Sequence, residues 1–294
     1  MVRVCSSVVV FFYFMNTVQR HFLGWDKPFL PEVAKWLQEH YLSAELGRAK
    51  NVLILVSGQE VVRRLQNTLV GNASKEGKAM VLPSIETTSQ CLDRLMDASL
   101  LIADTTTVEL ATSSILRGME QEEILTIAGA RRPSDEDMTS WFAIAKQICS
   151  AFATLSGGGI STDRSAWPKK AQEVLTDSAK ERFDTLHSIQ QKLQVQLQED
   201  GLALLEPSRL ALLDDKHQLD SGEIEHVVLV GATDLSGMVL QTVNKLRDSG
   251  VSIDALIRAP ETKQNSFDAY GCVEVSHWSD ANIEIPDKND GKNE

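Results

Sequence analysis

Two short apolar runs, each leading into a turn and a helical pattern, constrain the fold of this chain most strongly. Val52–Val56 and Val227–Val230 have the continuous β-branched and leucine content of strands buried on both faces of a parallel sheet. The second run continues through a helical pattern at 235–248 into a further strand at 252–257, which gives a βαβ unit with parallel strands. The phosphate-loop pattern GxxxxGK(S/T) does not occur in the sequence. These features predict a nucleotide-binding type of α/β core that lacks its phosphate loop.

A long polar segment with helical periodicity separates the two strand regions. Within it, residues 177–199 carry apolar residues at helical spacing, and Ser134–Asp137 offers capping acids for a helix that continues through Trp141. We therefore expect an α/β fold class with a parallel sheet and a largely helical inserted subdomain. The expected parts are a poorly ordered extension (1–21), the first part of the core (22–100), the helical insert (101–215), the second part of the core (216–279) and an acidic tail (280–294).

Composition limits the classes of function. The chain has 294 residues, of which 43% are hydrophobic and 24% charged, as in ordinary globular proteins. Its net charge of -12 argues against a surface that is basic overall, so nucleic-acid binding would require a locally basic groove. The four cysteines are far apart and show neither a disulfide framework nor zinc-ligand spacing, which favours a reducing cytoplasm.

The first residues do not have the pattern of a targeting or membrane segment. The apolar run at 8–14 is too short to span a bilayer as a helix, and no small-residue cleavage site follows it. Met15 directly precedes the first polar and patterned residues. We therefore expect residues 1–14 to be an extension from an upstream start codon, and we expect no membrane association.

The turn after the second apolar run allows two interpretations. An ordinary strand-to-helix turn, capped by Thr233 or Asp234, is favoured because a carboxylate at Asp234 would repel a cofactor phosphate. The alternative is an NAD(P)-binding oxidoreductase of the short-chain-dehydrogenase-like class. In it, Gly231, Asp234 and Gly237 would form the cofactor turn, and Arg258 would meet a ribose phosphate. Such a fingerprint usually opens its domain, whereas this one comes late in the chain.

Asp254, Glu261 and Lys263 imitate the two acids and the lysine of a metal-dependent nuclease. Glu261 and Lys263 follow Pro260 in a polar stretch and not on a rigid apolar strand, so a chance match is favoured. None of the six histidines has partners at ligand or triad spacing in the sequence. We expect no catalytic residue, no cofactor and no metal in this chain.

Paired arginines follow the first apolar run. Ser57 and Gln59 belong to the turn after this strand, and Arg63 and Arg64 lie on the next helix. Backbone amides and arginines at such a helix start can hold nucleic-acid phosphates, although a solvated helical face is the commoner origin of paired charges. The same two interpretations apply to the other basic pairs, at 131–132 and 169–170.

Three segments, in order along the chain, carry a family resemblance. Phe22–Leu37, Asn51–Leu65 and Phe267–Trp278 resemble the amino-terminal region of AddB-like proteins, which are RecB-family PD-(D/E)XK nucleases. The resemblance is distributed over residues 22–285 and has no single diagnostic motif.

The resemblance implies a degenerate superfamily-one helicase core, with a parallel sheet of the P-loop-helicase-like type that lacks a Walker A loop. Residues 52–69 would lie near a DNA-contacting helicase motif, and residues 227–234 near the Walker B strand. In such proteins this part lacks ATPase activity and holds DNA, while a carboxyl-terminal nuclease domain that uses magnesium cuts it. The implied function is a non-catalytic DNA-binding scaffold in bacterial double-strand-break repair, with DNA and an AddA-like helicase-nuclease subunit as partners. The sequence ends soon after the resemblance, so we expect a product truncated before the nuclease domain.

Overall fold

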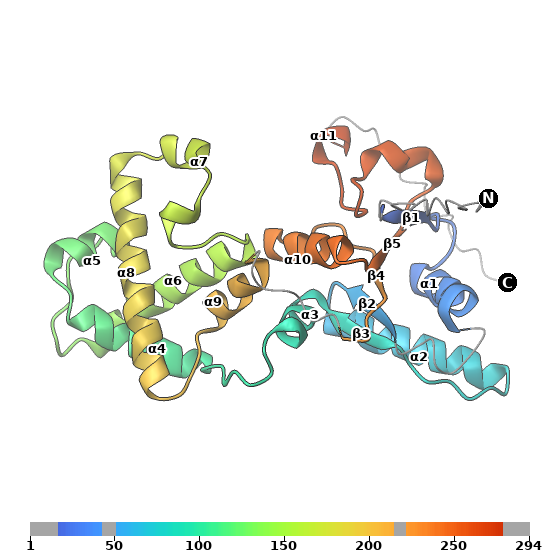
Figure 1. Cartoon of the computed structure of the whole chain (residues 1–294), viewed down its shortest axis with the longest axis horizontal. Helices are drawn as coiled ribbons and strands as arrows, with labels where there is room; N and C mark the ends of the chain where they lie inside the picture. The colour runs from blue at the N-terminus through green and yellow to red at the C-terminus, as the bar shows by residue number, and fades with distance from the viewer. Residues whose placement is uncertain (1–16, 43–50, 215–221, 279–294) are drawn as a thin grey trace, which may run out of the picture.

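A computed structural model describes residues 17–42, 51–214 and 222–278, and it places five parallel strands in one sheet. The strand order is β1-β5-β4-β2-β3, so strands that are distant in the sequence are neighbours in the sheet (Figure 1). The fold class is therefore α/β with an all-parallel sheet. The strands are β1 (Gln19–Phe22), β2 (Val52–Val56), β3 (Ser84–Thr87), β4 (His226–Val230) and β5 (Ser252–Ile257).

The two apolar runs of the sequence form the centre of this sheet. β2 pairs with β4 along its whole length, from Val52 opposite His226 to Val56 opposite Val230. All five residues of β2 are buried, because helices cover both faces of the sheet. The continuous apolar character of these strands thus reflects a central position.

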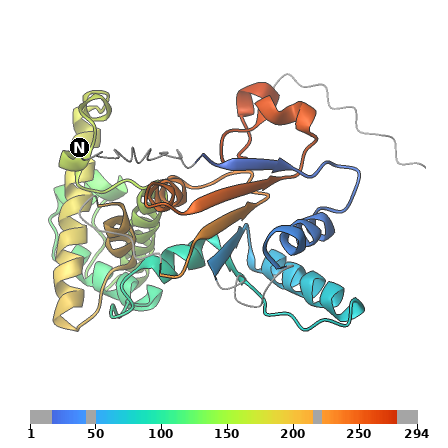
Figure 2. The same ribbon diagram turned by 45° about the vertical axis from the view of Figure 1, so that its right-hand side comes forward.

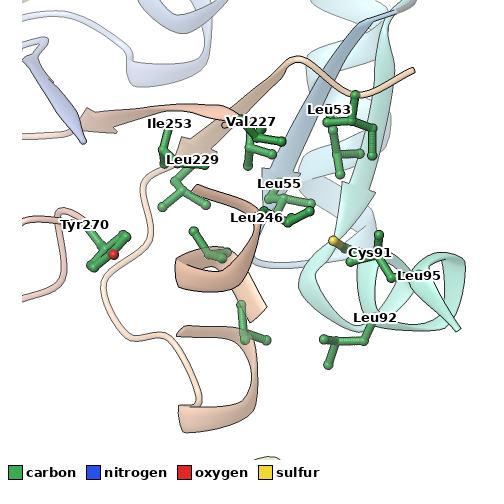
Figure 3. Packing of buried hydrophobic residues seen from close by; sticks show 14 of the residues in the cluster. Leu53, Leu55, Cys91, Leu92, Leu95, Val227, Leu229, Leu246, Ile253 and Tyr270 are labelled. Atoms are coloured by element: carbon green, nitrogen blue, oxygen red, sulfur yellow. The ribbon is translucent and has the colours of Figure 1, made fainter. Parts of the chain in front are cut away.

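Four helices make the outer layers of a three-layer sandwich. Even-numbered residues of β2 and β4 face α1 and α2, whereas odd-numbered ones face α3 and α10. Figure 3 shows the core on the α3 and α10 face of the sheet, in which Leu246 of α10 lies beside Leu55 of β2. The helices are α1 (Phe29–Leu37), α2 (Gln59–Lys75), α3 (Thr88–Leu95) and α10 (Gly237–Asp248).

The connections from the two central strands run in opposite directions. β2 continues through α2 to β3 on one side, and β4 continues through α10 to β5 on the other. Right-handed crossovers that diverge in this way place their helices on opposite faces of the sheet. The carboxyl ends of β2 and β4 therefore flank a topological switch point, where open α/β sheets usually bind their ligands.

The chain between α3 and β4 forms a second, helical core. Trp141, Phe152 and Ile189 are almost completely buried there. Figures 1 and 2 show these helices to one side of the sheet. Its helices are α4 (Thr105–Arg117), α5 (Gln121–Ala128), α6 (Met138–Gly157), α7 (Lys169–Glu173), α8 (Asp177–Glu199) and α9 (Leu205–Leu210). Short helical segments complete the described chain: 38–42, 164–166, 211–213, 261–266 and α11 (Val275–Trp278).

The helical part contacts the sheet domain through α6, α9 and the segment 211–213. Arg209 of α9 forms an ion pair of 2.6 Å with Asp93 of α3. The start of α10 lies against the end of α6, where a Cβ atom on Gly237 would overlap the carbonyl oxygen of Gly158. Gly237 is thus a packing residue that lets two helix ends approach closely.

Most element predictions agree with the structure, with local corrections. The strand predicted at 252–257 and the helix predicted at 177–199 are confirmed. Strand β3 begins at Ser84, directly after Pro83, because proline cannot donate a ladder hydrogen bond. The extension expected over 1–21 is wrong at its end, since Gln19–Phe22 forms edge strand β1 beside β5. Residues 1–14 and 280–294 lie outside the described residues.

Gly237→Ala tests the close approach of the two helix ends. The added methyl group would meet backbone atoms that cannot move independently, so we expect the free energy of unfolding to fall by about 1–3 kcal/mol. Gly71→Ala is the matched control, because a Cβ atom at this helical position meets nothing within 4 Å. That change should stabilise the protein by about 0.5–1 kcal/mol. Urea unfolding of both variants measures the difference, and equal effects would contradict the packing role.

Candidate functional site

The switch point between β2 and β4 is the candidate functional site. The turn after β2 contains Ser57 and Gly58, and the turn after β4 runs from Gly231 to Ser236. Both turns lead into a helix whose amino-terminal end lies at the same edge of the sheet. Backbone amides at helix starts attract anions, so this edge is where an anionic ligand would bind.

The turn after β2 is open. Gly58 is the residue before α2, no side chain caps this helix, and a Cβ atom on Gly58 would meet nothing within 4 Å. Ser57, Gln59, Arg63 and Arg64 are all exposed at or near the start of α2. The structure thus gathers the four predicted nucleic-acid-binding residues at one helix end.

The two arginines of this helix differ in their partners. Arg64 Nε lies 2.8 Å from Glu60 Oε1, one helical turn away, and both side chains are more than 60% exposed. No ion pair involves Arg63 within the part of the chain that the structure describes. An exposed pair of this kind is worth about 1 kcal/mol at most, so Arg64 can exchange Glu60 for a phosphate at little cost.

The turn after β4 is filled by protein. Gly231 has a positive φ of 57°, and a Cβ atom there would lie 2.9 Å from the ring of Phe29. The cap predicted at Thr233 or Asp234 is wrong, because Ser236 accepts the hydrogen bond from the backbone amide of Val239. Ser236 directly precedes the first residue of α10, which is the capping position, whereas Thr233 and Asp234 lie farther from the helix.

The residues of the alternative dinucleotide site do not form a cofactor cradle. The carbonyl group of Gly158 occupies the space beside Gly237. The backbone amide of Val273 donates a hydrogen bond of 3.1 Å to the carbonyl oxygen of Thr233. Asp234 and Arg258 are both exposed. The cavity beside the start of α10 measures about 180 Å³, less than the roughly 300 Å³ of a small ligand pocket. This geometry gives the oxidoreductase interpretation no support.

That small cavity lies between the sheet domain and the helical part, and Glu206 lines it. Ser156 and Arg209 lie on the same wall, and Ser89 and Ser236 lie at the starts of α3 and α10. Burial raises the pKa of Glu206 above its ordinary value of 4.5, although Arg209 acts in the opposite direction. A carboxyl group at this contact is therefore more easily kept neutral than one in water.

A buried carboxylate forms a polar cluster elsewhere, under α1. Asp254 of β5 is only 7% exposed. Its Oδ1 lies 2.7 Å from His21 Nε2 on β1, and its Oδ2 accepts a hydrogen bond of 2.5 Å from the Tyr41 hydroxyl. His226 Nδ1 lies 3.4 Å from the same hydroxyl. The cluster joins β1, β4, β5 and the helical turn at 38–42.

This cluster has the composition of a catalytic site but a structural geometry. Both oxygens of Asp254 already have partners, and Trp36 lies over His21 at a centroid distance of 4.7 Å. Burial and the Asp254 carboxylate raise the pKa of Tyr41 far above its ordinary value, so the phenol stays protonated. The arrangement therefore satisfies a buried charge and fastens edge strand β1 to β5.

The histidine partners were missed in the sequence for a physical reason. An acid at Asp254, between apolar neighbours on a buried strand, signals that it must be paired. The partner His21 could not be found because β1 was assigned to the extension. Glu261 and Lys263, in contrast, lie after β5 in an exposed helical turn, and Lys263 is positioned over the Trp278 ring.

Neither metal chemistry nor a reactive thiol is supported by the described residues. Within them, no three His, Cys, Asp or Glu side chains are placed to hold a metal ion. Burial raises the pKa of Cys91 to about 12 and that of Cys272 to about 11, and it also raises the pKa of Cys149. These thiols stay protonated at neutral pH, so they are poor nucleophiles.

Comparison with known proteins provides no family. No family model matches the chain, and no curated protein matches it significantly in sequence. Within the described residues, none of the helices combines the length and apolar character needed to cross a bilayer.

A double-mutant cycle with Tyr41→Phe and Asp254→Asn tests the buried cluster. The hydrogen bond between these side chains predicts a coupling energy of about 0.5–3 kcal/mol in urea unfolding. A control cycle pairs Tyr41→Phe with Asp248→Asn, whose carboxylate contacts Arg247 on α10. The control should be additive, and additivity in both cycles would contradict the structural role of the cluster.

Glu206→Gln tests the carboxyl group at the contact of the two parts. Because its pKa is raised in the folded state, the folded protein binds this proton more tightly than the unfolded chain does. The stabilisation is complete below the ordinary pKa and is lost as the pH rises through the raised value. The variant should therefore melt at a higher temperature than the wild type at pH 7, with a smaller difference at pH 4. Exposed Glu199→Gln is the control, and an equal pH dependence in both variants would refute the burial effect.

Proposed function

We propose that this chain is a non-catalytic, DNA-binding scaffold built on a helicase-like α/β core. The observation that carries the proposal is the open start of α2, at the carboxyl end of a central strand. Gly58 leaves its backbone accessible there, and Arg63 and Arg64 lie on the next turn of the helix. Amides at a helix start together with arginines suit the phosphates of a nucleic-acid backbone.

The two turns at the switch point have different roles in this proposal. Phe29, Gly158 and Val273 crowd the turn after β4, whereas Gly58 has no such neighbour, so we place the ligand on the β2 side. A strand of DNA would pass over Ser57 and Gln59 and meet Arg63, while the pair of Glu60 with Arg64 exchanges for a phosphate. Contacts of this kind go to the backbone of the nucleic acid and therefore bind without reading its sequence.

The resemblance to AddB-like proteins gives the proposal its biological setting. We infer a role in bacterial double-strand-break repair in the cytoplasm, beside an AddA-like helicase-nuclease subunit and with a magnesium-dependent nuclease domain that is not among these residues. An all-parallel sheet with a helical insert between β3 and β4 supports this inference. The absence of a phosphate-loop pattern from the sequence agrees with a core that holds DNA and does not hydrolyse ATP.

Arg63→Ala combined with Arg64→Ala tests the proposed contact. We expect saturable binding of the wild type to a fluorescent single-stranded oligonucleotide, measured by anisotropy over a series of salt concentrations. The double variant should bind more weakly, with a salt slope smaller in magnitude by about 1.4, since each lost phosphate contact to a single strand removes about 0.7.

Lys169→Ala with Lys170→Ala provides the matched control, because it also removes two adjacent exposed cations, on α7. This control should retain the wild-type affinity and slope. No binding by the wild type at low salt would contradict the proposed function. Equal losses in both double variants would contradict the assignment of the site to α2.

A further inference from the structure

A second basic site lies in the helical part, between the end of α4 and the start of α5. A cavity of about 770 Å³ opens there, and Arg117, Arg131 and Arg132 line it. Glu120 is the one acidic residue among the lining residues that the structure describes. Among the lining residues, three arginines therefore outnumber the one acid, although the chain as a whole has a net charge of -12.

Arg132 is fixed in place at the base of this cavity. Its Nη2 donates to the carbonyl oxygen of Arg117 at 2.8 Å and to Asp135 Oδ1 at 2.9 Å, and its Nε donates to the carbonyl oxygen of Met119 at 3.3 Å. The guanidinium also lies 5.3 Å from the centre of the Trp141 ring, and the side chain is 29% exposed. An arginine held in this way loses little conformational entropy when it binds a ligand.

The loop that carries the arginines is also fixed. The backbone amide of Arg132 donates to Gln121 Oε1 on α5 at 3.0 Å. The carbonyl oxygen of Ser134 accepts hydrogen bonds from Trp141 Nε1 at 3.0 Å and from the Asp137 amide at 3.1 Å. Trp141 is completely buried, so the cavity wall is anchored to the core of the insert.

Two arginines at this cavity have no acidic partner among the described residues. Arg117 and Arg131 are exposed, and neither forms an ion pair within the described ranges of the chain. Arg132 is only partly compensated, since Asp135 binds one side of its guanidinium and no hydrogen bond of its Nη1 is found among the described residues. Counting Glu120 and Asp135 against the three arginines leaves one net positive charge at the cavity.

We propose that this arginine cavity binds phosphate groups, in the first place those of a nucleic-acid strand. Arginine guanidinium groups match the oxygens of phosphate in pairs, and a cavity of this size accepts a phosphate with its sugar. The assignment to nucleic acid rests on the function proposed above, whereas the binding of a phosphate oxyanion does not. The strand would then contact the chain in both the sheet domain and the helical insert.

Arg117→Ala with Arg131→Ala tests this site in the full chain. These exposed arginines do not hold the loop, and Arg132, which does, is left intact. The same single-stranded oligonucleotide is titrated by anisotropy, and sodium tripolyphosphate is titrated by calorimetry. We expect the wild type to bind both, with competition between them. The variant should lose tripolyphosphate binding, and its oligonucleotide salt slope should be smaller in magnitude by about 1.4.

The other outcomes separate this inference from the proposed function. If the variant binds the oligonucleotide as the wild type does, and the wild type does not bind tripolyphosphate, the proposal of a phosphate site in the arginine cavity is wrong. The proposed site at α2 is then unaffected. If the wild type binds tripolyphosphate and the variant does not, but the wild type does not bind the oligonucleotide, the assignment to nucleic acid is wrong. The cavity is then still a site for phosphate oxyanions. Binding of neither ligand overturns both proposals. The lysine double variant of α7 again controls for loss of charge, and its tripolyphosphate binding should be unchanged.

Discussion

The parallel pairing of β2 with β4 is the interaction on which the rest of the structure depends. It joins strands from opposite ends of the described chain, and the whole helical insert lies between them in the sequence. The entropic cost of closing such a long loop rises only slowly with loop length, by about 0.6 kcal/mol for each doubling. Burial of both strands on both faces offsets that cost and brings two turns together at one edge of the sheet.

The helical insert packs against the turn after β4. Its helix α6 ends against Gly237, and together with Phe29 and Val273 it fills the space after β4. The turn after β2 has no such neighbour at Gly58. The insert thus crowds the half of the switch point that was considered for a dinucleotide, and the half that carries the arginines of α2 is less crowded. The same insert contributes the arginine cavity between α4 and α5, so the two proposed contacts with nucleic acid lie in different parts of the fold.

Much of the fold could be predicted because periodicity reports burial directly. The apolar run of β2 and the amphipathic stripe of α8 both follow from it, and both elements are present as predicted. Edge strand β1 could not be found in this way, because its four residues are mostly polar and only partly buried, and its His21 contacts Asp254. For the same reason the polar cluster under α1 was invisible in the sequence. The packing of the Gly158 carbonyl group against Gly237 could not be predicted either. A glycine that makes room for a cofactor and a glycine that makes room for a backbone carbonyl group look the same in a sequence.

Hydrogen exchange of the full chain, with and without saturating single-stranded DNA, tests the central claim most directly. Backbone amides at the start of α2 are exposed and uncapped in the free protein, and a bound phosphate would engage them. The account predicts slower exchange in peptides that cover residues 57–64 when DNA is bound, and unchanged exchange in peptides that cover 231–237. Unchanged exchange at 57–64 under conditions in which DNA is bound, or protection centred on 231–237, would contradict it.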